Sequence, residues 1–205
     1  MFRPPICLFF IAALMAPRGV NAELSLHSAP TVILDFTGPW SRTSLNEMRR
    51  EAGDILSASG VPLDWRILGE DGPETDRDMV VMTFRGACRY QEATPGSTPG
   101  NTGAGPLGFT RMVDGEVQPF GEVNCERVAE LVRRAMSGND GARGELLFGR
   151  AMGRVVAHEL VHMLTRSGRH GAEGVEKPAL SGGQLISGYL PLSESDVEWL
   201  RRDLR

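Results

Sequence analysis

Long runs of charge, long apolar runs and excess positive charge are all lacking from this sequence. Charged residues make up only 23% of the 205 residues, while hydrophobic residues make up 41%. This composition excludes a wholly disordered chain and supplies enough apolar residues for one domain with a substantial core. The net charge is −4. An acidic chain has no electrostatic footprint for nucleic acid, so we expect no nucleic-acid partner.

No apolar run is long enough to span a bilayer, but one near the N-terminus has the length of a signal-peptide core. It begins at Ile6 (ICLFFIAALM), after the positive charge of Arg3. Val20-Asn21-Ala22 then has the small-x-small form that signal peptidase cleaves. We therefore expect residues 1–22 to be a signal peptide and residues 23–205 to be a single secreted or periplasmic domain, free of the membrane after cleavage. An uncleaved membrane anchor is the alternative.

Cysteine is also scarce. Cys7 lies inside the expected signal peptide, which leaves Cys88 and Cys125 in the mature chain. An even number of cysteines in an exported protein indicates a disulfide, worth about 4 kcal/mol in the chain-entropy model. Two buried free thiols are the alternative. Neither cysteine belongs to a C-x-x-C pair, so both are poor candidates for metal ligands.

The hydrophobic pattern predicts an α+β fold. Apolar, β-branched runs predict strands, and apolar residues at helical spacing predict helices. The expected strands are 31–36, 65–68, 79–84, 109–113 and 117–123, with Asp114-Gly115 as a hairpin turn; the expected helices are 44–58, 126–136, 145–165 and one that begins at Ser193, with 166–192 mostly irregular. This order predicts a mixed sheet covered by helices, with the fully apolar run 79–84 as a central strand.

Residues 94–108 are rich in glycine, proline, serine and threonine, which predicts a loop. Gly103, Gly105 and Gly108 formally match the spacing of a dinucleotide-binding fingerprint. Such a loop follows a strand and opens a helix, whereas this one precedes an expected strand. We therefore do not interpret it as a nucleotide site.

The strongest motif is His158-Glu159-Leu160-Val161-His162 on the expected helix 145–165. Two histidines four residues apart lie one turn along a helix and about 40° around it, so both imidazoles can meet one zinc ion. Glu159 lies beside them as the expected general base for a zinc-activated water. The helix is apolar nearly all round, and Gly149 and Gly153 lie one turn apart, which favours close backbone packing in the core. Two hydrogen-bonded core histidines are the structural alternative.

A catalytic zinc needs a third protein ligand and one open position. His170 is the leading candidate, because Gly168 lets the chain turn back after the helix. The remaining histidine, His27, is remote in sequence and is expected at the surface. Glu173 and Glu176 are rival ligands.

Residues 157–170 (AHELVHMLTRSGRH) resemble the active-site region of metzincin zinc peptidases, and in particular a bacterial group of secreted metzincin-like proteins. The resemblance extends more weakly over about residues 30–205. It implies a zincin-like mixed sheet with an active-site helix and a C-terminal helical subdomain, one catalytic zinc, and a peptide substrate bound along an edge strand within 107–123. Where relatives often have Gly-Ile-Met, this chain has Gly174-Val175-Glu176, and no methionine follows Met163.

These observations favour a zinc peptidase or related amide hydrolase, with zinc polarising the carbonyl oxygen of the substrate. Three residues are candidates to stabilise the oxyanion, and the sequence does not choose among them: Arg166, Arg169 and Tyr189. A gluzincin-type hydrolase, with Glu194 as third ligand, is the alternative within the same metal class. A non-catalytic exported metal-binding module is the alternative from a different class.

Overall fold

The structure, a computed structural model, describes residues 29–70, 79–92, 105–137 and 140–203. The expected signal peptide 1–22, His27 and most of the loop 94–108 lie outside the described residues. None of the described helices is both long enough and apolar enough to cross a membrane.

Within the described residues, the chain forms one mixed sheet of five strands in the order β2-β1-β3-β5-β4. The strands are β1 (Thr31–Phe36), β2 (Asp64–Ile67), β3 (Met79–Arg85), β4 (Gly108–Val113) and β5 (Glu116–Asn124). Strands β2, β1, β3 and β5 are parallel to one another, whereas β4 pairs antiparallel with β5 and forms one edge of the sheet. The apolar strand β3 is central, as predicted.

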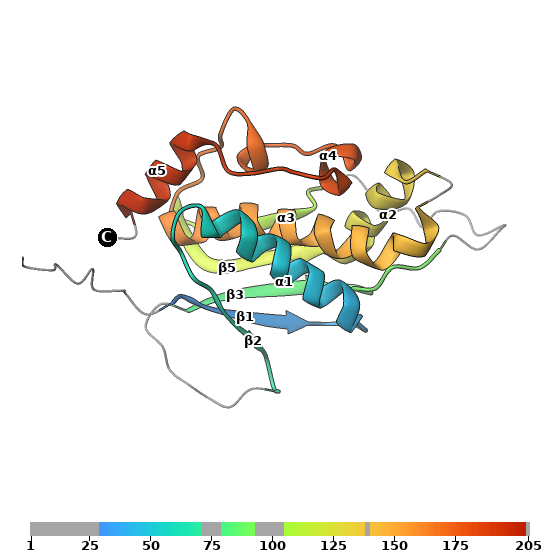
Figure 1. Cartoon of the computed structure of the whole chain (residues 1–205). Coiled ribbons are helices and arrows are strands. Elements are labelled where there is room, and N and C mark those ends of the chain that lie inside the picture. The colour runs from blue at the N-terminus through green and yellow to red at the C-terminus, as the bar shows by residue number, and fades with distance from the viewer. Residues whose placement is uncertain (1–28, 71–78, 93–104, 138–139, 204–205) are drawn as a thin grey trace, which may run out of the picture.

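The helices are α1 (Arg42–Ser57), α2 (Cys125–Ala135), α3 (Gly144–Thr165), α4 (Gly182–Ile186) and α5 (Glu194–Asp203), with short 3-10 turns η1 (Gly141–Arg143) and η2 (Gly174–Glu176). Figure 1 shows α1 and α3 side by side over the sheet, with the C-terminal segment lying across α3 on the side away from the strands. The predicted mixed α+β architecture is confirmed. The segment 166–192 is mostly irregular, as predicted, with η2 and α4 as short helical stretches within it.

Local sequence signals explain where several elements begin and end. Ser41, Asn124 and Ser193 accept hydrogen bonds from backbone N–H groups in the first turns of α1, α2 and α5. Asp114 and Gly115 both have positive φ, of 51° and 83°, as a two-residue turn between β4 and β5 requires. Ser181 and Gln184 form a capping box at the start of α4. The pattern of apolar residues did not predict this short helix, because its start is marked by polar residues.

The close approach of α1 to α3 depends on two glycines. A Cβ on Gly149 would lie 2.6 Å from the carbonyl oxygen of Ser44, and one on Gly153 would lie 2.8 Å from that of Met48. The prediction that these glycines allow close packing is confirmed. The apolar residues of α1 and α3 join those of the sheet in one core, which extends to Val175 and Leu200 in the C-terminal segment.

The predicted disulfide is present between Cys88, after β3, and Cys125, at the first residue of α2. Both cysteines are fully buried, and the Cys125 sulfur lies 3.8 Å from that of Met152 on α3. The bond therefore ties the end of the central strand to the layer of helices.

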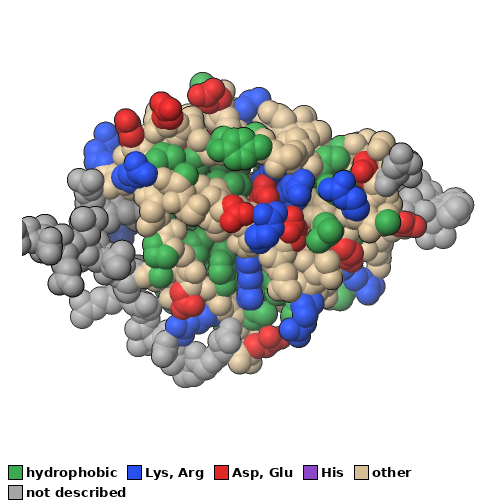
Figure 2. Space-filling model, viewed as in Figure 1, with side chains coloured by type: hydrophobic (Ala, Val, Ile, Leu, Met, Phe, Trp, Pro, Cys, Tyr) green, Lys and Arg blue, Asp and Glu red, His purple; other side chains and the backbone are tan. Residues whose placement is uncertain are grey.

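On the face of the molecule seen in Figure 2, acidic side chains lie next to basic ones. Helix α1 carries a network of such charges, in which Arg50 pairs with Glu47 at 2.7 Å and with Asp54 at 2.6 Å.

Candidate metal centre

Helix α3 carries the HExxH motif and is buried along most of its length. It ends at Arg166, which has φ 50° and ψ 38°. The N–H groups of Arg166 and Ser167 bond to the carbonyls of Met163 and His162, which is a Schellman-type end. The prediction that Gly168 makes the turn is wrong, because the left-handed residue comes two positions earlier and Gly168 does not have a positive φ.

Three histidines converge here, two from α3 and one from the chain that follows it. One nitrogen from each of His158, His162 and His170 lies within 4.8 Å of those of the other two. The Nε2 atoms of His158 and His162 are 3.1 Å apart. His162 is buried, His158 is half-buried and His170 is exposed. The cluster therefore has two imidazoles, those of His158 and His162, that are held by the buried helix, and a third, that of His170, that faces solvent.

The other ring nitrogens of the two helical histidines bond to backbone carbonyls. His158 Nδ1 lies 2.9 Å from the oxygen of Val175, and His162 Nδ1 lies 2.8 Å from that of Ser167. A carbonyl can only accept, so each Nδ1 is the protonated donor, and in the neutral ring each Nε2 then has a free lone pair. Both lone pairs thus belong to nitrogens that face the cluster.

Electrostatics favours the same neutral form. Burial lowers the pKa of His158 to about 4, helped by the neighbouring His162 and His170 and opposed by the bond to Val175. Burial also lowers the pKa of His162. Both imidazoles are therefore neutral at pH 7, which is the form that binds metals.

The donor set fits a zinc ion. At zinc–nitrogen distances near 2.05 Å, tetrahedral geometry places two ligand nitrogens about 3.3 Å apart, close to the 3.1 Å between the Nε2 atoms of His158 and His162. The exposed position of His170 leaves the site accessible from solvent. The rival carboxylates do not join the cluster: Glu173 and Glu194 are exposed, and Glu176 lies near the Nδ1 of His158.

Glu159 is 4% exposed, and its Oε2 accepts a 2.8 Å hydrogen bond from Thr110 on the edge strand β4. Burial raises its pKa to about 7, and the bond from Thr110 opposes the shift. A carboxyl with this pKa can exchange protons near neutral pH. A Cβ on Gly108 would lie 2.9 Å from Glu159 Oε1, so the absence of a side chain there lets β4 pass close to the acid.

The described structure places all three residues that were candidates for stabilising the oxyanion outside the hydrogen bonds of the histidine cluster. Arg169 is engaged elsewhere: its guanidinium stacks 4.2 Å from the ring centroid of Trp199 and bonds to Asp196 at 3.3 Å. Tyr189 is 83% exposed, and Arg166 is also at the surface. None of the three contacts the histidine cluster through a hydrogen bond among the described interactions.

A second buried acid lies next to the cluster. Glu176 is fully buried, and its Oε1 is 3.6 Å from His158 Nδ1. Burial raises its pKa to about 9, with further contributions from Asp196 and Glu159, while Arg169 lowers it. Sequence reasoning treated Glu176 only as a rival ligand, and it missed Thr110 and the carbonyls of Val175 and Ser167 altogether.

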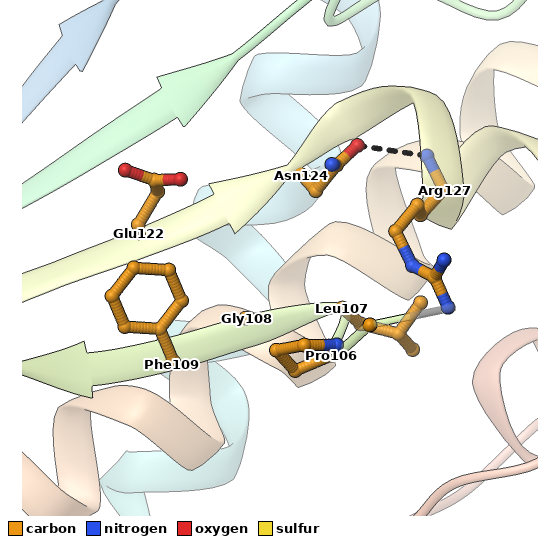
Figure 3. A pocket seen from close by; sticks show the side chains of 8 residues that line it. Pro106, Leu107, Gly108, Phe109, Glu122, Asn124 and Arg127 are labelled. Carbon is orange, nitrogen blue, oxygen red and sulfur yellow. Dashed lines mark hydrogen bonds between the residues drawn. The ribbon is translucent and has the colours of Figure 1, made fainter. Parts of the chain in front are cut away.

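A pocket of about 180 Å³ opens where β4 begins, close to Glu159 through Gly108. It is lined by residues from the preceding loop, β4, β5 and the start of α2: Gly105, Pro106, Leu107, Gly108, Phe109, Glu122, Asn124 and Arg127. Figure 3 shows Phe109 and Glu122 projecting from neighbouring strands, with the side chain of Asn124 bonded to the backbone of Arg127.

No protein-family model matches this sequence, and no curated protein matches it. Among solved structures, the chain is similar to archaemetzincin from Methanopyrus kandleri, with a TM-score of 0.49 and 13% sequence identity. The similarity covers 88% of this chain and 99% of the archaemetzincin chain. At this level of similarity, the case for a function rests on the residues of the site itself.

Proposed function

We propose that this protein is an exported zinc-dependent metallohydrolase of the metzincin-like type, which cleaves peptide bonds. The observation that carries the proposal is the convergence of three imidazoles beside a buried glutamate. The two helical histidines have Nδ1 atoms bonded to carbonyls and neutral rings, so each offers a ligand lone pair at Nε2. His158, His162 and His170 would hold one zinc ion, with His170 supplied by the chain that follows α3.

A zinc ion held there would act as a Lewis acid on the substrate carbonyl and would lower the pKa of its bound water towards about 7. The protein's own acid–base group is Glu159, whose pKa of about 7 suits it to take a proton and to return it to the leaving amine. Thr110 fixes one of its oxygens, and the other lies at the backbone of Gly108.

Strand β4 offers the means to hold a peptide. It is an edge strand of the sheet, and its residue Thr110 contacts Glu159 directly. An extended peptide paired to this edge would gain main-chain hydrogen bonds while its backbone lies beside the catalytic acid. The pocket that is lined by Gly105, Phe109 and Arg127, among others, opens at the beginning of the same strand and gives room for a substrate side chain.

Export is part of the proposal, and its support is the N-terminal sequence pattern. Edman sequencing of the protein from the periplasm or medium should begin near Glu23. A folded product that retains Met1 in the membrane fraction would contradict export without affecting the proposed chemistry.

The chemistry is tested by metal analysis of the purified protein together with hydrolysis of fluorescein-labelled casein. We expect about one zinc per chain, loss of hydrolysis after dialysis against a chelator, and recovery on addition of zinc. Stoichiometric zinc without hydrolysis of casein or of a peptide library would favour the non-catalytic metal-binding module. Hydrolysis that survives complete removal of metal would contradict the proposal.

A further inference from the structure

His170 differs from the other two histidines of the cluster in what holds it. His158 and His162 lie on the buried helix α3, and their rings are bonded to the carbonyls of Val175 and Ser167. His170 is exposed on the chain after α3, and neither its ring nor its backbone makes a hydrogen bond in the described structure. The position of this ring therefore depends on the residues on either side of it.

The residue before it, Arg169, is fastened to helix α5. Its guanidinium lies 4.2 Å from the centroid of the Trp199 ring and donates to Asp196 Oδ1 at 3.3 Å. Trp199 and Asp196 are both buried, whereas the Arg169 side chain is half exposed. An exposed arginine thus joins the chain at His170 to two buried residues of α5.

The residue after it, Gly171, lies against the same part of α5. Its N–H donates to the carbonyl of Glu176 at 2.8 Å, and a Cβ at this position would lie 2.8 Å from Asp196 Oδ2. That oxygen also accepts a 2.6 Å hydrogen bond from Ser193, at the start of α5. One carboxylate of α5 therefore lies against both neighbours of His170.

Helix α5 is itself held by contacts that do not involve this chain. It packs on α3, as Figure 1 shows, and Leu200 is fully buried in the core. The Arg201 side chain donates to the carbonyl of Ala58, after α1, at 2.7 Å. The helix can therefore serve as a fixed support for the segment that carries His170.

We propose that Arg169 is a positioning residue for the metal, which holds His170 at the cluster by fastening the chain before it to Asp196 and Trp199 of α5. A ligand that is already in place loses less conformational entropy when the cation binds, so the contact strengthens metal binding. The inference rests on the proposed zinc site.

The charge of Arg169 makes the opposite prediction, which allows a sharp test. A guanidinium near a dication repels it, so removing the positive charge would by itself strengthen zinc binding. Loss of positioning would weaken it. The sign of the change in zinc affinity therefore separates the two effects.

The test measures zinc affinity by competition with a chromophoric chelator at one fixed pH. The variants are Arg169→Ala, which removes both contacts with α5, and Arg169→Lys, which keeps a cation that can lie over Trp199 and reach Asp196. Arg202→Ala is the matched control, because it removes an exposed arginine from α5 itself. Arg169→Ala is also made in the His170→Ala background and measured there with a weaker chelator, and the absorption spectra of the cobalt-loaded proteins report on the ligand geometry.

We expect Arg169→Ala to bind zinc about 10-fold more weakly than wild type, in the range of other outer-shell partners, and Arg169→Lys to recover most of the loss. Arg202→Ala should bind like wild type. In the His170→Ala background, Arg169→Ala should cause no further loss, because the ligand that it positions is gone. The cobalt spectrum of Arg169→Ala should shift towards that of His170→Ala.

Unchanged or tighter zinc binding by Arg169→Ala would overturn the inference. An equal loss in the His170→Ala background would also overturn it, because that result marks a general loosening of the fold. If the wild-type protein itself bound no zinc, the proposed function would fail and this inference with it.

Discussion

Replacing Arg154 by methionine should destabilise the protein without removing any residue of the candidate metal centre. Arg154 is fully buried on α3, one turn before His158. Its guanidinium pairs with Glu51 of α1 at 2.7 Å and donates to the carbonyls of Gln184 and Ser187. It therefore connects α1, α3 and the end of α4 at a single point.

The magnitude follows from what the substitution leaves behind. Removing one member of a buried ion pair costs about 3–5 kcal/mol, because the remaining charge loses its partner. Glu51 would keep Arg50 at 3.2 Å and Arg150 at 3.9 Å, which reduces the cost. The carbonyls of Gln184 and Ser187 would each lose one donor but keep another, from Ser187 Oγ and Arg150 respectively, so they add little to the cost. We expect about 3 kcal/mol, or roughly 6–12 °C in the thermal midpoint of a domain of this size.

The assay is urea unfolding monitored by circular dichroism, with Arg50→Met as the control. Arg50 also pairs with Glu51, but its side chain is 49% exposed, so its loss should cost less than about 1 kcal/mol. The double variant Glu51→Gln, Arg154→Met should be little less stable than Arg154→Met alone, because no buried charge remains unpaired. A loss below 1 kcal/mol for Arg154→Met would refute this reading of the ion pair.

Three further predictions concern the candidate centre. Glu159→Gln should keep zinc but slow casein hydrolysis by about 100-fold or more, because it removes the base and leaves the ligands; near-normal turnover would exclude Glu159 as the base. His170→Ala should weaken zinc binding in a chelator competition by more than about 100-fold, since even outer-shell partners contribute 10- to 100-fold. Glu194→Ala should bind normally, and the reverse result would favour the gluzincin alternative. The pKa of Glu176, raised by burial from 4.5 to about 9, means that the folded state holds a proton that the unfolded state releases. The metal-free protein should therefore lose stability between pH 7 and 9, and Glu176→Gln should flatten that slope in thermal denaturation; an unchanged slope would contradict the assignment.

The sequence was sufficient for the parts of the fold that depend on local pattern. The runs 31–36 and 79–84 became adjacent parallel strands, because each has the apolar, β-branched character of a buried strand. The buried helix was predictable because it is apolar nearly all round, and its close packing against α1 because of its paired glycines. The disulfide followed from the number of cysteines.

The candidate site was only partly predictable, for a physical reason. The spacing of His158 and His162 along a helix determines their relative placement, so the motif was enough. The hydrogen-bond acceptors behind those rings are main-chain carbonyls, and no residue type marks them in a sequence. Thr110 is 49 positions from its partner Glu159, and the two meet only in the folded protein, where β4 pairs with β5 and α3 packs against both strands.

The turn after α3 shows that residue type alone does not predict which residue adopts a positive φ. Glycine is the residue that most easily adopts a positive φ, so Gly168 was the reasonable choice for the turn. The left-handed residue is instead Arg166, because the last turn of α3 presents the carbonyls of His162 and Met163 directly to the next two N–H groups. An arginine in this conformation carries a steric cost of about 1 kcal/mol, which two hydrogen bonds and the packing of the helix offset.

One stripe of α3 organises the whole C-terminal segment. Arg154, His158 and His162 follow each other at intervals of four residues, and each bonds to main-chain carbonyls of the segment after the helix, at Ser187, Val175 and Ser167. Those bonds hold the returning chain against the helix, and His170 lies at the cluster on that chain. A site that is preorganised in this way loses little conformational entropy when a cation binds. The two helical histidines therefore have a double function, since the same imidazoles that would bind zinc through Nε2 hold the C-terminal segment in place through Nδ1.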